Sequence, residues 1–355
     1  MIYNGDYQNN TIYGTANNHK LKVNTADDAN FMICELAVNY NGIDWSHTFE
    51  APFFNNNAEL YIENYIHSII TQNFDFSDVD INAFKLYHFS LAQINITLKE
   101  MLFDEELDTL DLTFKMVLGN FNETPELNIT NGAKILLPIT QTSFFTSKGV
   151  LCISFIASET PEKLIVNDGN LNTENNLPLS TSNLILHTLV IPLKLCIGSD
   201  STALEITLEF SDQSTLQLGT YSIIDDSIDH SLMWFQNDFG TLSCLEFIGE
   251  LKIDDNFKYK NFEYSENNIN RFNTTEITYN TRFNINTGYI IDHEKYTSLY
   301  SLLKSFQIFL LRDSLIKVLS DGNQKLMSFK SNYYLNNETL KFKTAQNDNI
   351  HYRVF

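Results

Sequence analysis

The chain has 355 residues, a formal net charge of −21, 43% hydrophobic residues and 19% charged residues. So acidic a chain is repelled by nucleic acid and by anionic membrane surfaces, which excludes charge-driven binding to either. The first 250 residues hold 9 Lys and Arg against 33 Asp and Glu, whereas residues 251–355 hold 14 against 11. The slightly basic C-terminal part is suited to meet an acidic surface of a neighbouring copy, although simple solubility is the stronger interpretation of the charge imbalance.

The composition favours strands joined by many turns. The 27 Phe and 17 Tyr residues fit pleated, half-buried surfaces. The 42 Asn residues suit turns with positive φ, for which the chain has only 13 Gly. We predict a mainly β fold of antiparallel sandwich-like or barrel-like domains with a few short helices. The expected divisions are an N-terminal arm (1–19), a β-rich domain with one short helix (20–180), and a second β-rich domain (181–355).

Alternation of apolar and polar residues dominates the first half of the chain. Residues 1–19 are polar and rich in turn residues, so we expect an arm or an initial hairpin outside the core. Near-helical spacing predicts a short helix within 58–72, capped by Asn56 or Asn57. Asn41 and Gly42 predict a turn. Strands are predicted at 21–23, 31–38, 83–103, 109–118 and 150–157.

The second half begins with a polar stretch, 158–182, that we expect to be a boundary or a long exposed loop with a turn at Asn167–Gly169. The clearest helix is 293–306, started by Asp292. Its predicted apolar stripe contains Tyr296, Leu299, Tyr300, Leu303 and Phe306. Strands are predicted at 183–197, 203–210, 214–224, 230–253, 258–290, 308–311, 315–319, 340–344 and 351–354.

No motif with a known chemistry occurs in the sequence. It lacks a glycine-rich phosphate loop, a GxSxG elbow and an HExxH pair. We therefore predict no catalytic, cofactor-binding or metal-binding residues, and no cofactor. A glycosidase whose two carboxylates meet only in space stays open, as does a carbohydrate platform of exposed aromatic rings. For most of the Phe and Tyr residues, packing within sheets is the stronger interpretation.

Three polar clusters hold oxygen ligands close together, and for each a solvated loop is the stronger interpretation than a cation site. The first is the acidic run 104–111, with five acids. The second is the group Asp225, Asp226, Asp229 and His230. The third is the series Asp168, Asn170, Asn172 and Glu174, which alternates oxygen ligands as a calcium loop does but lacks the full EF-hand pattern.

The four cysteines lie far apart within apolar runs, at Cys34, Cys152, Cys196 and Cys244. No CxxC spacing occurs, so we expect buried free thiols rather than a zinc site, and folding in a reducing compartment. The N-terminus shows neither the basic nor the apolar region of a signal peptide. The apolar runs are too short and too polar to span a bilayer, so we expect no membrane insertion.

Residues 230–253 hold the densest pattern, HSLMWFQNDFGTLSCLEFIGELKI. A strand through Trp234 ends at Asn237, a turn follows to Gly240, and a second strand leads to Gly249, with Trp234 and Phe247 expected to pack across the hairpin. This resembles a hairpin of tail-associated structural proteins of Bacteroidota phages and prophages. In that family a W-L-N-x-x-G element precedes an aromatic-rich strand that ends near a Gly. Here Phe235 and Gln236 stand where Leu directly precedes Asn in the family.

The order of elements downstream is also similar to that family. Thr287-Gly288-Tyr289 precedes the helix 293–306, the hairpin 307–319 and a segment that ends at Phe342–Ala345. The resemblance covers residues 180–355, and more loosely 20–180. It implies a virion protein, assembled in the host cytoplasm, that builds a tail hub, baseplate or tail-tip ring from copies of itself and other tail proteins. It brings no catalytic residues.

Three other functions stay open from the sequence. The first is a virion protein at another place in the particle, either a head–tail connector ring or a receptor-binding fibre. A fibre is expected to show repeats or a coiled-coil stalk. The second is a carbohydrate-binding adhesin module, which predicts an export signal and glycan binding. The third is a hydrolase of cell-wall glycan, which predicts activity lost with one carboxylate pair.

Overall fold

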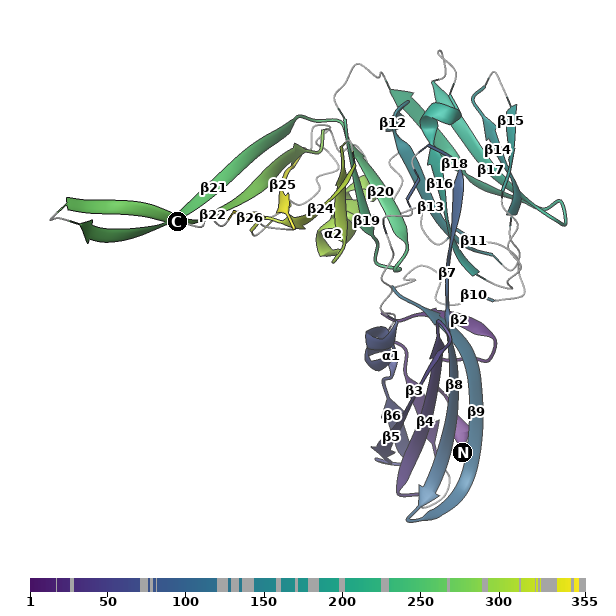
Figure 1. Cartoon of the computed structure of the whole chain (residues 1–355). Helices are drawn as coiled ribbons and strands as arrows, with labels where there is room; N and C mark the ends of the chain where they lie inside the picture. Colours follow the sequence, from purple (N-terminus) through teal and green to yellow (C-terminus); the bar gives the residue numbers. More distant parts are fainter. Residues whose placement is uncertain are drawn as a thin grey trace.

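The computed structural model describes residues 1–16, 18–25, 29–70, 76, 79–80, 82–119, 127–128, 134–135, 144–157, 161–169, 172–177, 185–197, 202–224, 230–266, 269–288, 293–312, 314–322, 324, 326, 337–345 and 348–350. Within these ranges the chain is mostly β, as predicted, with five sheets and two α-helices. Figure 1 shows the N-terminal sheets at the bottom, the middle sheets above them and the C-terminal sheet to the left.

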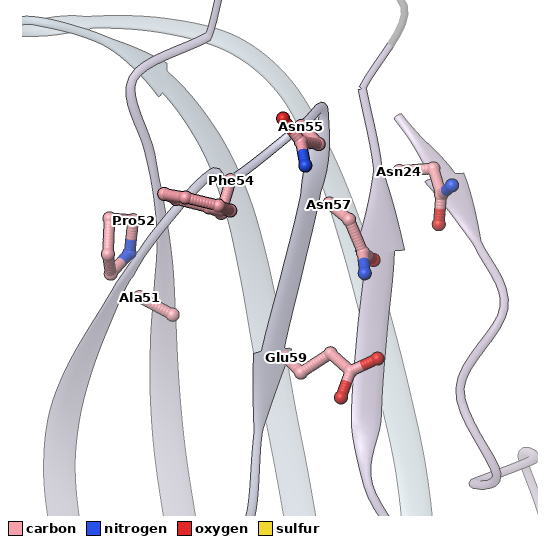
Figure 2. Close-up of a pocket in the computed structure, with 7 residues that line it drawn as sticks. All are labelled: Asn24, Ala51, Pro52, Phe54, Asn55, Asn57 and Glu59. Atoms are coloured by element: carbon pink, nitrogen blue, oxygen red, sulfur yellow. The ribbon is translucent and has the colours of Figure 1, made fainter.

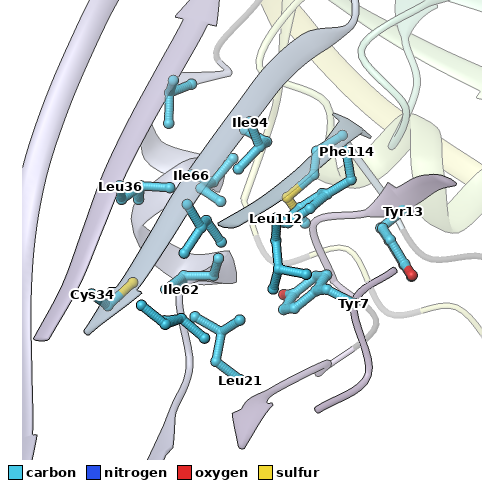
Figure 3. Close-up of a cluster of buried hydrophobic side chains, with 14 of the residues drawn as sticks. Tyr7, Tyr13, Leu21, Cys34, Leu36, Ile62, Ile66, Ile94, Leu112 and Phe114 are labelled. Carbon is cyan, nitrogen blue, oxygen red and sulfur yellow. The ribbon is translucent and has the colours of Figure 1, made fainter. Parts of the chain in front are cut away.

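The N-terminal part consists of a curved sheet in the order β10-β2-β9-β8-β4-β5, faced by a small sheet in the order β1-β3-β6 and by the helix α1. The strands of the curved sheet are β2 (Thr11–Gly14), β4 (Phe31–Tyr40), β5 (Ile43–Pro52), β8 (Ala92–Leu102), β9 (Glu105–Val117) and β10 (Leu127–Asn128). The facing elements are β1 (Ile2–Tyr3), β3 (Leu21–Asn24), β6 (Asn57–Leu60) and α1 (Glu63–Ile69). Figure 3 shows the core between them, where Leu21 and Ile66 meet Ile94 and Leu112.

The first residues contribute to this core, which corrects the expectation of an arm outside it. Tyr7 and Tyr13 are 1% and 0% exposed. Tyr7 stacks on Phe114 at 4.6 Å between ring centroids, and Tyr13 meets the same ring edge-on at 5.5 Å. Two large rings buried against a central strand explain why this polar, Asn-rich segment is held in place.

The short helix begins later than its apolar spacing predicts. Ala58 and Leu60 lie on β6 and pair with Val23 and Leu21 of β3, so strand pairing replaces the first turn of the expected helix. The helix starts after Ile62, which makes no side-chain capping bond. Asn56, one of the two predicted caps, instead has a positive φ of 60° and lies in a turn.

The middle part is a sandwich of two sheets around one apolar cluster. One sheet has the order β11-β13-β16-β7, formed by β7 (Lys85–Phe89), β11 (Lys134–Ile135), β13 (Val150–Ala157) and β16 (Ile185–Pro192). The other has the order β12-β18-β17-β14-β15, formed by β12 (Phe144–Thr146), β14 (Pro161–Asn167), β15 (Asn172–Asn176), β17 (Ala203–Phe210) and β18 (Thr215–Ile224). A 3-10 turn, Leu193–Leu195, follows β16.

Two of these strands, β14 and β15, lie within 158–182, which corrects the expectation of a long exposed loop. β13 and β14 pair with β16 and β17, so both sheets combine strands from before and after residue 180. The local composition is polar because β15 is an outer strand that pairs only with β14 among the described residues.

The C-terminal part is one sheet in the order β20-β19-β23-β24-β25-β22-β21, with β26 beside β22, and the helix α2 packs on it. Its elements are β19 (Ser231–Gln236), β20 (Leu242–Phe247), β21 (Leu251–Glu266), β22 (Ile269–Asn286), α2 (His293–Lys304), β23 (Ile308–Leu311), β24 (Leu315–Ser320), β25 (Thr339–Thr344) and β26 (Asp348–Ile350). The predicted cap Asp292 and the predicted strand 351–354 lie outside the described residues.

The buried stripe of α2 differs from the predicted one. Tyr296, Leu299 and Leu302 are 5%, 0% and 0% exposed, whereas Tyr300 is 43% and Phe306 is 95% exposed. Phe306 lies beyond the last helical residue, so the helical period no longer places it on the buried face.

The hairpin of β19 and β20 forms as predicted, but Trp234 and Phe247 do not pack against each other. Trp234 pairs with Cys244, and Phe247 lies three residues further along β20. Successive side chains of a strand alternate between faces, so an odd separation places the two rings on opposite faces. Trp234 belongs to the cluster shared with the middle sheets, and Phe247 to the cluster under α2.

The strands β21 and β22 extend beyond the rest of their sheet. β25 pairs with β22 at Arg282–Asn286, and β26 pairs with it at Ile277–Tyr279. Further out, residues 261–266 of β21 pair only with residues 269–274 of β22 among the described residues. Figure 1 shows this long two-stranded hairpin, the β21–β22 arm, projecting away from the body of the molecule.

Candidate functional site

Among the residues that the structure describes, the three polar clusters are not gathered into a cation site. In the run 104–111, Asp104 lies in the turn after β8 and the other residues form the exposed beginning of β9, where Asp108 accepts a hydrogen bond of 2.8 Å from the Met1 ammonium. Asp168 is buried and Glu174 lies on β15, while Asn170 lies outside the described residues. Asp225, Asp226 and Asp229 also lie outside them. In the described part of the chain no three His, Cys, Asp or Glu side chains are placed to hold a metal ion.

Two histidines meet across β7 and β16, which the sequence did not suggest. His88 pairs with His187 in the register, and their Nδ1 atoms are 3.0 Å apart. His187 is 1% exposed and stacks on Phe155 at 5.1 Å. Burial, and secondarily the charge of His88, lowers the pKa of His187 to about 3. Burial also lowers the pKa of His88. A neutral pair in which one ring donates to the other fits this distance.

No hydroxyl nucleophile is paired with these imidazoles among the described contacts. Ser154 and Thr188 lie one residue away from Phe155 and His187, so they face the other side of the sheet. There Ser154 Oγ lies 2.8 Å from Thr188 Oγ1 and 2.8 Å from Thr241 Oγ1. This chain of hydroxyl groups joins the middle sheets to the β19–β20 hairpin and is buried, so it ties sheets together rather than facing a substrate.

A second imidazole does contact a hydroxyl. Thr15 Oγ1 lies 2.9 Å from Nδ1 of His67, a residue of α1. Thr15 is 2% exposed, and a covered hydroxyl is not accessible to a substrate. In the described part of the chain no carboxylate lies within ion-pair distance of His67 to orient it as a base. The arrangement therefore lacks the third member that nucleophilic catalysis requires.

All four cysteines are free and buried, as predicted. Burial raises the pKa of the thiols of Cys34 and Cys196 to about 12. Burial also raises the pKa of Cys244, whose thiol interacts with Cys152. Since the thiolate is the reactive form, these thiols are inert packing groups at neutral pH.

One hollow of about 660 Å³ lies where β5 turns into β6. Figure 2 shows the amides of Asn24 and Asn57 with the carboxylate of Glu59 along it, and the ring of Phe54 beside the turn. Glu59 Oε1 pairs with Lys20 at 3.2 Å and with Lys22 at 3.3 Å, and the bond to Lys20 lowers the pKa of the carboxyl. The Oδ1 atom of Asn57 is buried without a partner. These groups offer hydrogen bonds to a polar ligand but no nucleophile.

A second hollow, of about 520 Å³, lies between the N-terminal sheets and the C-terminal sheet. His67 and Leu118 line one side, and Lys304, Phe306 and Lys317 line the other. The lysines give it a cationic character within a chain whose net charge is −21. The hollow holds no carboxylate pair of the kind that glycoside hydrolysis needs, because Asp238 is its one acidic lining residue among those described.

The sequence matches no protein-family model, and no curated protein sequence matches it at a significant level. In the described part of the chain, no helix is both long and apolar enough to cross a membrane.

Proposed function

We propose that the protein is a structural component of a phage virion, a building block of a tail hub, baseplate or tail-tip ring that works by symmetric self-association. The proposal starts from the resemblance of the β19–β20 hairpin and the following elements to tail-associated proteins. After the β19–β20 hairpin come β21 and β22, and then α2, the β23–β24 hairpin and β25 in chain order.

The β21–β22 arm is the observation that carries the proposal. Its outer residues, 261–266 and 269–274, form a ribbon of two strands with no further partner among the described residues. An isolated pair of strands is at best marginally stable in water, because it buries too little apolar surface and leaves two open edges. A ribbon of this length is explained when another molecule covers it, as happens in an assembly of repeated subunits.

The charge distribution supports the same conclusion. The first 250 residues carry a net charge of −24, and residues 251–355 carry +3. In a ring of identical subunits, each copy presents one surface to the neighbour ahead and another to the neighbour behind. Unlike charges on the two surfaces favour this head-to-tail arrangement over pairing of like surfaces.

The test is to purify phage or induced prophage particles from a host that carries the gene and to identify their proteins by mass spectrometry. We expect peptides of this chain in intact particles, in a fixed ratio to the tail-tube protein, and in isolated tails after heads are removed. Absence from particles that contain the other tail proteins would refute the proposal. Presence in heads alone would support the connector position instead.

A further inference from the structure

Unpaired sheet edges are the surfaces through which β proteins associate, and the five sheets of the described residues end in ten strands. Eight of these end strands have two to six residues: β1, β6, β10, β11, β7, β12, β15 and β20. The long end strands are β5, with 10 residues, and β21, with 16. Beside them, β26 is a short outer strand, and residues 269–276 of β22 are open beyond the part that β25 and β26 cover. Proteins keep edge strands short to prevent unwanted pairing. The two long edges therefore call for partners.

The edge strand β5 lacks two features that block strand addition, a bulge and a Lys or Arg side chain, although it carries Asp44, Glu50 and a terminal Pro52. It pairs with β4 over ten successive residues without a bulge. It contains no Lys or Arg, and Pro52 is its last residue. Ile43 is 56% exposed, and Trp45 and Phe49 are only partly covered. A long edge strand without a bulge that exposes an apolar side chain is a template for β-augmentation.

The turn before β5 determines which of its backbone groups are free. Asn41 and Gly42 have φ of 54° and 76°, the signature of a two-residue type I′ hairpin. Such a turn closes with the N–H of Ile43 directed to the carbonyl of Tyr40. Since the ladder alternates, the N–H groups of residues 44, 46, 48 and 50 are directed away from β4, toward the open edge.

β21 is the other long end strand. It pairs only with β22 over its whole length among the described residues. Its sixteen residues contain four acids and three Lys, and all three Lys lie within 251–260, whereas β5 contains Asp44 and Glu50 and no cation. The two strands lie in opposite parts of the molecule in Figure 1, β5 in the lower part and β21 in the projecting arm. They cannot meet within one chain.

We propose that β5 of one copy pairs with β21 of a second copy, so that the arm becomes a three-stranded ribbon on the neighbour's curved sheet. Residues 1–119 hold 5 Lys and Arg against 17 Asp and Glu, which opposes pairing of β5 with another β5. The contact joins two different surfaces, so repetition of it produces a ring or a filament. This inference rests on the self-association in the proposed function and identifies the strands that carry it.

Two variants of the full-length chain separate the two sides of the contact. Ser46→Pro with Thr48→Pro removes two outward N–H groups of β5 and leaves the bonds to β4 intact, since proline is tolerated at an edge position that faces solvent. Ser46→Thr with Thr48→Ser is the matched control, with unchanged composition. Replacing residues 261–275 by Asn-Gly shortens the arm to the part below the Lys260–Glu276 pair.

Sedimentation velocity over a concentration series measures the association. We expect the wild type and the control to form oligomers, and each of the two variants alone to be monomeric, with the dissociation constant raised at least about tenfold. Mixed together, the variants should form a 1:1 dimer, because one supplies the arm and the other supplies β5. Should the proline variant fail to fold by circular dichroism, Ser46→Lys with Thr48→Lys blocks the same edge by charge.

Several outcomes would overturn the pairing: a wild type that is monomeric throughout, a variant that assembles alone as the wild type does, or a mixture that stays monomeric. Self-assembly of the shortened variant would refute pairing of β5 with the outer arm, and would indicate pairing of β5 with residues 251–260 or with another β5. These results are independent of particle composition. If the protein is present in tails but both variants still form oligomers alone, the edge pairing is refuted and the tail function stands. If the pairing behaves as expected but the protein is absent from particles, the tail function is refuted and the pairing stands.

Discussion

Lowering the pH should weaken the middle sheets through His187. Its imidazole is 1% exposed, lies 3.0 Å from His88 Nδ1 and has a pKa lowered from 6.5 to about 3. Between pH 6.5 and pH 3, His187 therefore binds a proton in the unfolded chain but not in the folded chain. The free energy of unfolding consequently falls as the pH falls below 6.5. For one group with these pKa values, the loss between pH 7 and pH 5 is about 2 kcal/mol.

Urea unfolding at pH 7 and pH 5 measures this loss. Trp234 is buried in the same cluster as Leu186 and Val190 of β16, so its fluorescence reports on the strand that carries His187. Trp45 is the other of the two tryptophans, and Trp45→Phe leaves a single reporter. In this background we expect His187→Gln to remove most of the pH dependence.

His47→Gln, on the exposed face of β5, is the matched control and should retain the pH dependence of the parent. Equal losses of stability for the parent and for His187→Gln between pH 7 and pH 5 would refute the assignment of the proton uptake to the buried histidine pair.

Three further changes test the packing. Asn237→Ala should lower the free energy of unfolding by about 2–4 kcal/mol, because the Asn237 side chain forms hydrogen bonds with backbone N–H and hydroxyl groups in and beside its own turn. A loss under about 0.5 kcal/mol would contradict that role. Gly149→Ala should cost about 1–3 kcal/mol in thermal or urea unfolding, since its Cβ would overlap Oε2 of the buried Glu246, whereas the exposed neighbour Lys148→Ala should change little. None of the four cysteines should react with a thiol reagent before unfolding, and all four should react in denaturant.

The sequence predicted correctly those strands and turns whose first and last residues are determined by residues next to them in the chain. Val150–Ala157 is a strand with the predicted bounds, because a continuous apolar run is bounded by polar turns. Gly240 with φ of 73° ends the β19–β20 turn, as its position predicted. The short helix near Ile62 was misplaced, because the pairing of β6 with β3 depends on a strand more than 30 residues away.

The candidate surfaces were harder to predict. The His88–His187 contact joins residues 99 apart in the chain, and no spacing rule relates them. Trp234 and Phe247 were expected on one face, and the register of the hairpin placed them on two. The predicted strands 230–253 and 258–290 overlapped β21, no strand was predicted at β5, and nothing in the sequence marked either one as an edge.

The sequence by itself determined the mainly β class, a turn at Asn41–Gly42, the buried free cysteines and the uneven charge, because each depends on residue type or on neighbours in the chain. Only the tertiary structure decided which strands have partners on both sides. That property depends on the arrangement of the whole sheet, since a strand is an edge only when no other part of the chain pairs with it. The two long open edges, β5 and β21, are consequently the tertiary result on which the proposed assembly depends.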